Sequence, residues 1–222
     1  MSEIQDSRVA IKTTLPVFPL PPNEQRRAIL TERLLLRPFN NDEEDAQSLN
    51  SLRSEPDTMK WSSQGRPDKD LAETKRNAFV QMVPPNDTQR FIWLICLKST
   101  GEFIGLGGVK DWVGDLGWPE AGYMLMEKAW GQGYATEFLR AFLEAWWALP
   151  RQETEITVDV STVVGNAEKK QEVVFARTGS SHSSSQNVLK KAGFQVVKER
   201  DQADPRDPTK RMTIFSYIAK KK

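Results

Sequence analysis

One stretch near the middle of the chain places an apolar strand, a glycine-bearing turn and an amphipathic helix in direct succession. It spans residues 124–147, and Gly131 and Gly133 flank Gln132 where the strand leads into the helix. Glycine lets the backbone turn sharply here, so the first N–H groups of the helix, which have no partner within the helix, face outward. Such amides, backed by the helix dipole, suit an anion such as a pyrophosphate. The stretch therefore predicts a strand–helix unit that binds phosphate through its backbone.

The helix after this turn carries its apolar residues on one side. They recur at the spacing of a single helical face, which predicts that the helix packs against a sheet; they are Phe138, Leu139, Phe142, Leu143, Trp146 and Trp147. Two better-known phosphate loops do not occur, since the sequence contains no Gly-x-x-x-x-Gly-Lys-[Ser/Thr] and neither glycine cluster, 105–108 nor 131–136, completes Gly-x-Gly-x-x-Gly. A nucleotide-binding turn of another kind and an ordinary strand-to-helix turn both stay open at this point.

Composition narrows the class of protein. The 222 residues, 38% hydrophobic and 27% charged, supply one core of ordinary size. A formal net charge of +1, with both signs interspersed, argues against nucleic acid or an anionic membrane as the main partner. No apolar run reaches the length of a signal peptide or membrane helix, so we expect a soluble, cytoplasmic protein. Cys96 and His182 are the only residues of their types, which disfavours a disulfide, a metal centre and a Ser-His-Asp hydrolase.

The first 27 residues are polar and are then interrupted by prolines. Pro16, Pro19, Pro21 and Pro22 prevent a helix and favour an extended arm. A disordered tail and a strap laid on the domain are both compatible with this composition. We therefore divide the chain into an arm at 1–27 and one domain at 28–219.

Hydrophobic periodicity and turn residues place the other elements. Strands are expected at 29–37, 91–97, 103–109, 120–126, 154–160, 195–200 and 212–218, and helices from the acidic run at 40–45 to about 53, at 68–82, after Gly133 and at 183–192. Cys96 lies inside a strand and is expected to be a buried structural thiol. Glycines 105, 107 and 108 weaken their strand unless another group approaches its backbone closely, for which a bound ligand and bulky neighbouring tryptophans are equally good reasons.

Strings in three parts of the sequence resemble the GCN5-related N-acetyltransferases (GNAT). Lys128-Ala-Trp-Gly131-Gln-Gly133 resembles the family's coenzyme A loop, [Arg/Gln]-x-x-Gly-x-[Gly/Ala], with Lys in the first position. The string 31–39, followed by an acidic helix start, resembles the opening of the RimJ/RimL-like branch. The string 183–194 resembles the second coenzyme-contacting helix of that branch, with His182 in place of the usual Asn. The resemblance covers roughly residues 29 to 219.

The resemblance implies an α/β (α+β) fold. Its central sheet is mixed, mostly antiparallel and six- to seven-stranded, with about four flanking helices, and it is splayed at the central strands to admit the coenzyme. The family usually has a short connection between the strand expected at 154–160 and the helix expected at 183–192, so we interpret residues 162–182 as an insertion. A bulge near Leu125 and Met126 is expected to free a main-chain N–H that holds the thioester oxygen. The coenzyme contacts that the resemblance implies are Leu125, Met126, Lys128, Gly131, Gln132, Gly133, Tyr134, Ala135 and His182.

The activity that the resemblance implies is acetyl-CoA-dependent N-acetyl transfer by direct attack in a ternary complex, with acetyl-CoA as co-substrate and no metal. Glu120 is the candidate general base, with a solvated strand-end carboxylate as the alternative. Ser185 is the candidate proton donor to the coenzyme sulfur, and a helix cap is its alternative role.

The acceptor stays open between a protein or peptide α-amine and a small-molecule amine, and the protein is expected to be a monomer or a homodimer. Trp61 and Ser62 lie in the connection that walls the acceptor side, where they either contact substrate or simply pack. Tyr123 is interpreted as packing or substrate wall. A catalytically impaired acyl-CoA-binding or protein-interaction module is the alternative to an enzyme.

Overall fold

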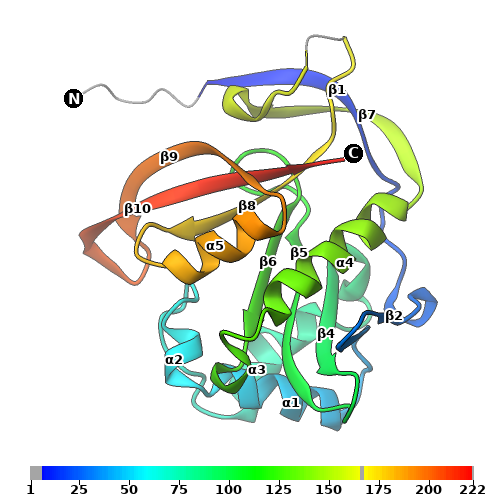
Figure 1. The fold of residues 1–222 in the computed structure, drawn as a ribbon, viewed down its shortest axis with the longest axis vertical. Helices are drawn as coiled ribbons and strands as arrows, with labels where there is room; N and C mark the ends of the chain where they lie inside the picture. The colour runs from blue at the N-terminus through cyan, green and yellow to red at the C-terminus, as the bar shows by residue number, and fades with distance from the viewer. Residues whose placement is uncertain (1–6, 166–167, 222) are drawn as a thin grey trace.

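The computed structural model describes residues 7–165 and 168–221, and one large sheet dominates it (Figure 1). The order of its eight strands is β2-β3-β4-β5-β6-β8-β10-β9. Their bounds are β2 Ile29–Leu30, β3 Leu34–Arg37, β4 Phe91–Leu97, β5 Phe103–Asp111, β6 Glu120–Leu125, β8 Val173–Gly179, β9 Gln195–Asp204 and β10 Asp207–Lys220. Adjacent strands are antiparallel except β6 and β8, so the predicted mixed, mostly antiparallel sheet is confirmed, with eight strands rather than the six to seven expected.

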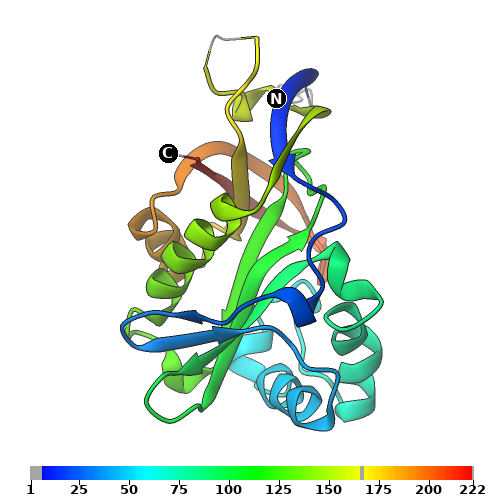
Figure 2. The same ribbon diagram turned by 90° about the vertical axis from the view of Figure 1, so that its right-hand side faces the viewer.

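Helices cover both faces of this sheet (Figure 2). On one face lie α4 (Tyr134–Ala148) and α5 (Ser183–Lys191), and on the other lie α1 (Glu43–Arg53), α2 (Pro56–Met59) and α3 (Leu71–Asn77). Short 3-10 turns occur at Asn23–Gln25, Phe79–Gln81, Asn86–Gln89, Glu127–Ala129 and Val160–Thr162. The helix predicted at 68–82 is shorter than expected because Asp70 caps its first turn, while Asp68 accepts a hydrogen bond from Arg53 at 2.6 Å.

The sheet is splayed between β6 and β8, as predicted. The two strands are parallel and share a single residue pair, Glu120 with Phe175. Beyond that pair β6 continues to Leu125 without a partner on its β8 side, while its other edge stays paired with β5. The apolar face of α4 covers this region, and Phe138, Phe142 and Trp146 are completely buried against the sheet.

The interpretation of residues 162–182 as an insertion is wrong for residues 173–179. Residues 166–167 lie outside the described residues, but Val173–Gly179 form β8, a central strand paired with β10. The strand predicted at 154–160 exists as β7 (Arg151–Asp159), yet it lies outside the large sheet. The apolar run Val173, Val174 and Phe175 is fully buried, which is typical of a strand covered on both faces.

The described part of the N-terminal arm is a strap rather than a tail. β1 (Arg8–Pro16) pairs with β7 along its whole length as a separate two-stranded sheet, seen beyond one end of the large sheet in Figure 1. Ile11 and Leu15 are buried in a cluster with Trp118, whose indole Nε1 donates to Thr162 Oγ1 at 2.8 Å. The described residues of the arm therefore belong to the folded domain.

The glycines of β5 are explained by protein neighbours. A Cβ on Gly108 would lie 1.9 Å from the carbonyl oxygen of Phe91, and one on Gly107 would lie 2.5 Å from the Phe138 ring. Gly105 is equally close to the backbone of β6. The close approach that these glycines permit is that of the neighbouring strands and of α4, so neither a ligand nor a tryptophan is needed to account for them. In the preceding strand, Cys96 is buried as expected, and burial raises the pKa of its thiol.

Candidate active site

A cleft of about 460 Å³ opens where β6 and β8 separate. It is lined from three directions: by β6 and the turn after it, by the first turn of α4, and by α5 with the connection after α2. The lining residues are Thr58, Lys60, Trp61, Tyr123, Met124, Leu125, Ala129, Trp130, Gly131, Gly133, Tyr134, Ala135, Thr136, His182, Ser184, Asn187, Val188 and Lys191. Six of the predicted coenzyme contacts are therefore brought together: Leu125, Gly131, Gly133, Tyr134, Ala135 and His182.

The turn before α4 presents a row of main-chain amides. Gly131 and Gly133 have φ of 73° and 82°, in the left-handed region that favours glycine. Gly133 is the N-cap of α4, and its carbonyl accepts from Thr136 and Glu137. Among the described residues, no acceptor is found for the N–H groups of residues 131–135. These amides and the positive end of the helix dipole are thus at the wall of the cleft, in an arrangement of the kind that suits an anion.

Arg33 supports this turn from outside the cleft, a role that sequence reasoning missed. Its Nη1 donates to the carbonyl of Gln132 at 2.9 Å, and its guanidinium lies 4.7 Å above the Tyr134 ring. It also forms an ion pair with Glu137 at 2.7 Å, while Thr31 donates to the same carboxylate at 2.6 Å. The only sequence feature that could have pointed to Arg33 was the string 31–39, which resembles the family but does not indicate this contact.

The side chains of two other predicted coenzyme contacts, Lys128 and Gln132, do not point into the cleft. Lys128 forms an exposed ion pair with Glu102 at 2.5 Å. The side chain of Gln132 donates to the carbonyl of Lys128 at 2.8 Å. Neither side chain lines the cleft, and the contribution of Gln132 is its backbone.

The expectation of a free N–H at Met126 is wrong, because this group donates to the carbonyl of Ile104 at 2.9 Å. The irregularity in the β5–β6 pairing lies at the other end, between Val109 and Asp111. Because hydrogen-bonding direction alternates along an antiparallel strand, the N–H groups of Tyr123 and Leu125 point toward β8, into the gap. The Leu125 carbonyl is held by the Trp130 indole at 2.8 Å.

Tyr123, which lines the cleft, contacts Ser185 of α5, which is not among the lining residues. The Tyr123 hydroxyl donates to Ser185 Oγ at 3.1 Å, and burial raises the pKa of Tyr123 to about 12. Ser185 does not cap its helix, since the N-cap of α5 is His182, without a side-chain hydrogen bond. The pair joins the unpaired part of β6 to α5, so a serine hydroxyl is oriented beside the gap by a phenol that stays protonated.

His182 closes one side of the cleft together with Trp61. Their rings are stacked, with centroids 3.9 Å apart and planes 10° from parallel. Burial, and then the charge of Lys60, lower the pKa of His182 below 6.5. The imidazole is therefore neutral at neutral pH, which suits stacking against an indole.

Acidification is expected to weaken the stacking of His182 on Trp61. Because the pKa of His182 is lower in the folded state, its contribution to stability is complete above pH 6.5 and is lost as pH falls through the folded value. We expect the difference in unfolding free energy between the wild type and His182→Gln to shrink between about pH 7.5 and pH 5. Urea unfolding at both pH values measures it. A difference that stays constant would show that the stack does not respond to protonation.

Glu120 lies at the point where β6 and β8 part. It is only 2% exposed, so the alternative of a solvated carboxylate is wrong. Its Oε1 is 2.7 Å from Lys110 Nζ and accepts from Arg177 Nε at 3.0 Å. Among the described residues no partner is found for Oε2. Glu120 does not line the cleft itself but faces the opposite side of the sheet from α4.

Comparisons with known proteins agree with this geometry. A family model described as an acetyltransferase (GNAT) domain matches residues 33–195, whereas a search of curated proteins found no significant relative. A GNAT-family acetyltransferase from Bacillus anthracis is similar in structure, with a TM-score of 0.64 and 17% identity over 87% of this chain and 98% of that one.

Two structures from Vibrio cholerae are also similar. A spermidine N-acetyltransferase, solved with CoA and spermine, has a TM-score of 0.62 and 10% identity over 86% of this chain and 96% of its own. A structure assigned provisionally to the ribosomal-protein-serine acetyltransferases has a TM-score of 0.57 and 16% identity over 87% and 98%. Within the described residues, no helix is long and apolar enough to span a membrane, and no group of His, Cys, Asp and Glu side chains could hold a metal ion.

Proposed function

Because this chain belongs to the GNAT acetyltransferases and is an N-acetyltransferase, we propose that it transfers the acetyl group of acetyl-CoA to a primary amine by direct attack in a ternary complex. The observation that carries the proposal is the single cleft that joins the amides of residues 131–135 to the gap between β6 and β8. A pyrophosphate fits the first and a thioester arm fits the second. We also keep the predicted cytoplasmic location and the choice between monomer and homodimer as expectations from the sequence.

The coenzyme's placement follows from the unpaired main-chain groups. Its pyrophosphate accepts from the amides at the start of α4, and its arm runs along β6 in place of a neighbouring strand. The thioester oxygen then accepts from an N–H that points into the gap, for which Leu125 and Tyr123 are the candidates. Such a donor stabilises the negative charge that develops on this oxygen when the amine attacks the carbonyl carbon.

Breaking the carbon–sulfur bond leaves a thiolate that needs a proton. Ser185 is the proposed donor, since Tyr123 donates to its oxygen and thereby leaves the serine proton free to point at the sulfur. Tyr123 acts as a positioning residue in this scheme. The similar RimJ/RimL-like string at 183–194 supports the same assignment.

The attacking amine must first lose a proton, because α-amines have a pKa near 8 and lysine near 10.4. Glu120 stays the candidate base, with Oε2 as the atom that takes the proton. Its distance along β6 from Leu125, five residues or roughly 16 Å, means that the proton reaches it through a chain of water molecules.

The coenzyme half of the proposal is tested by Gly133→Val. A β-branched residue at φ of 82° is strained and changes the direction of the neighbouring amides. We expect acetyl-CoA affinity, measured by calorimetry, to fall at least about tenfold, the equivalent of roughly 1.4 kcal/mol. Gly101→Val is the matched control, since Gly101 has φ of 75° and nothing within 4 Å. Unchanged affinity in Gly133→Val would contradict the proposed phosphate site.

The transferase half is tested by thiol release from acetyl-CoA with a panel of peptides, amino acids and polyamines. The solved relatives bear names that point to a ribosomal protein and to spermidine, so both acceptor classes are included. Turnover with one class establishes the acceptor. Tight coenzyme binding without turnover for any amine would favour the alternative of a catalytically impaired binding module.

A further inference from the structure

The face of the splayed sheet opposite α4 has a hollow, where Gly122 has no side chain and where charged side chains lie nearby. Side chains alternate along a strand, so Glu120, Gly122 and Met124 of β6 share the face opposite α4. Lys110 of β5 lies over the same face, since a Cβ on Gly122 would meet its Cδ and Cε at 3.7 Å. Met124 lines the cleft, which therefore reaches through the gap to this face.

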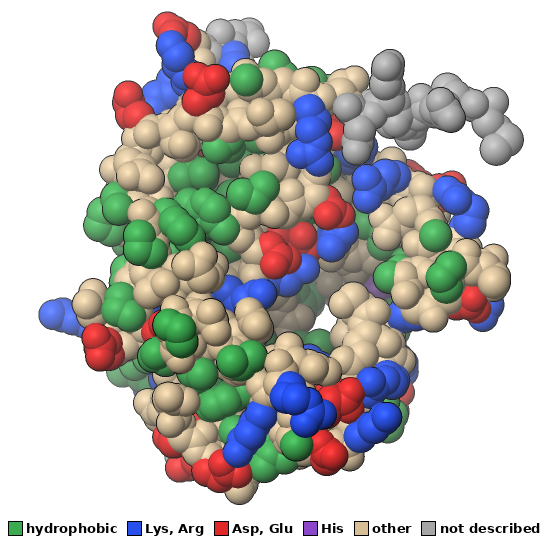
Figure 3. Space-filling model, turned by 180° about the vertical axis from the view of Figure 1, so that it is seen from behind, with side chains coloured by type: hydrophobic (Ala, Val, Ile, Leu, Met, Phe, Trp, Pro, Cys, Tyr) green, Lys and Arg blue, Asp and Glu red, His purple; other side chains and the backbone are tan. Residues whose placement is uncertain are grey.

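Arg177 of β8 faces Lys110 across the point where the strands part. Both cations contact the same oxygen of the buried Glu120, at 3.0 and 2.7 Å. Both are about one-third exposed, so each presents part of its charged group to the hollow. Figure 3, which views this face, shows a hollow with basic and acidic side chains gathered beside it.

The carboxylates around these two cations are all paired. Asp111 lies 3.4 Å from Lys110 and 3.8 Å from Arg90, and Asp115 forms an ion pair with Arg177. Asp111, Asp115 and Glu120 are thus each neutralised by a cation. A polyamine needs unpaired carboxylates to bind several positive charges, so these three carboxylates do not favour one.

The turn between β9 and β10 partly covers this hollow. Arg206, in the turn between β9 and β10, donates to the carbonyl of Lys60 at 2.7 Å. A Cβ on Gly65 would lie 2.6 Å from the Arg206 side chain, which shows how closely the turn packs on the connection after α2. With the Trp61–His182 stack beside it, this contact narrows access to the hollow, which favours a small molecule or a free chain end as the acceptor.

We infer that the acceptor is an amine that also carries a carboxylate, which Lys110 and Arg177 bind while Glu120 holds them in place. The inference rests on the proposed acetyl transfer and narrows its acceptor. Three to five residues of β6 separate Glu120 from the level of Tyr123 and Leu125, roughly 10 to 16 Å. An extended peptide advances about 3.5 Å per residue. The carboxylate therefore lies about three or four residues from the α-amine that attacks.

The test compares alanine tripeptide and tetrapeptide as free acids with the same peptides as C-terminal amides, and with spermidine. In the wild type we expect kcat/KM for the acids to exceed that for the amides at least about tenfold, the scale of a charge-assisted hydrogen bond. In Arg177→Gln the acid-to-amide ratio should fall to about one; the ratio is compared within each variant, because Arg177 also contacts Glu120 and its loss can change the rate on both peptides. Lys110→Met, which keeps the aliphatic stem over Gly122, should lower the same ratio.

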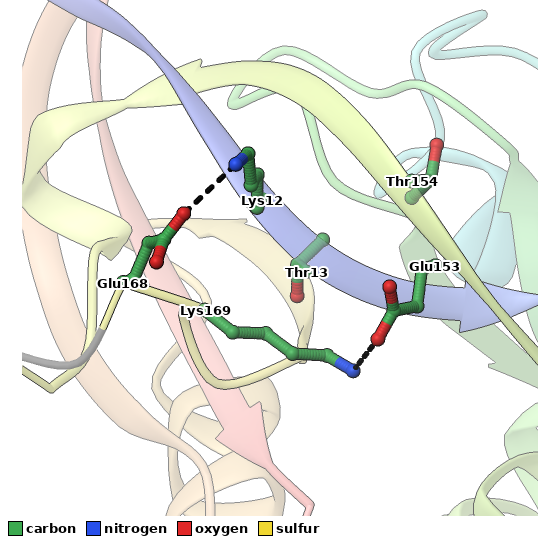
Figure 4. Close-up of a pocket in the computed structure, with 6 residues that line it drawn as sticks. All are labelled: Lys12, Thr13, Glu153, Thr154, Glu168 and Lys169. Carbon is green, nitrogen blue, oxygen red and sulfur yellow. Dashed lines mark hydrogen bonds and ion pairs between the residues drawn. The ribbon is translucent and has the colours of Figure 1, made fainter.

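Lys12→Gln is the control, because Lys12 lies on β1 of the separate two-stranded sheet and its side chain forms an exposed ion pair with Glu168 (Figure 4). It should keep the wild-type ratio. Equal rates for acid and amide in the wild type, a preference for spermidine, or an unchanged ratio in both cation variants would overturn the inference. No turnover with any acceptor would also overturn it, and calorimetry with acetyl-CoA would then show whether the coenzyme half of the proposed function falls with it.

Discussion

Ser185→Ala is expected to lower kcat for acetyl transfer about a hundredfold, at the lower end of what general acid catalysis contributes. The reason is that the departing thiolate loses its proton donor, whereas the amides of residues 131–135 still bind the coenzyme. The affinity for acetyl-CoA should therefore change little. Steady-state thiol release gives kcat, and calorimetry gives the affinity.

Two variants sharpen this prediction. Tyr123→Phe removes the hydroxyl that orients Ser185 at 3.1 Å but keeps the ring, so we expect a smaller loss, about tenfold. Ser183→Ala removes a hydroxyl of the same helix that is not the hydrogen-bond partner of Tyr123, and should resemble the wild type. If Ser185→Ala kept full activity, Ser185 would be a packing residue and the proton donor would be a different group.

The largest effect on stability is expected from Gly108→Ala. The added Cβ would lie 1.9 Å from the Phe91 carbonyl oxygen, and φ is 141°, so both overlap and backbone strain oppose it. We expect the free energy of unfolding to fall by at least about 3 kcal/mol, measured by urea denaturation. Gly101→Ala, at φ of 75° with nothing within 4 Å, carries only the strain and should lose about 1 kcal/mol. Equal losses in the two variants would mean that β4 moves away to accept the methyl group.

The parts of the site that were predicted are those that local sequence determines. The turn with Gly131 and Gly133, its position before a helix and the apolar face of α4 all lie within 24 consecutive residues, 124–147. Glycine preference and helical periodicity act at this range, so the amide row was foreseen. The expectation of a free N–H at Met126 was wrong, because which strand edge is paired depends on the register with Ile104.

The errors concern pairings between distant segments. The alternating, β-branched residues of β7 are typical of any half-buried strand, and nothing in them indicates that the partner is β1. The apolar run at 173–175 did carry the signal of a buried strand, but the expected family spacing led us to interpret it as part of an insertion. The contacts of Tyr123 with Ser185 and of Trp61 with His182 each join separate elements, which periodicity cannot reveal.

The pairing of β1 with β7 also sets an order of events during synthesis. Arg8 pairs with Asp159, so the strand that leaves the ribosome first meets its partner only after about 150 more residues. At the usual rate of translation this interval is roughly 10 to 30 s. During that time Ile11 and Leu15 have no Trp118 or Val158 to pack against. The nascent chain thus carries an unpaired apolar strand until β7 is complete, which makes this segment a natural client for chaperones.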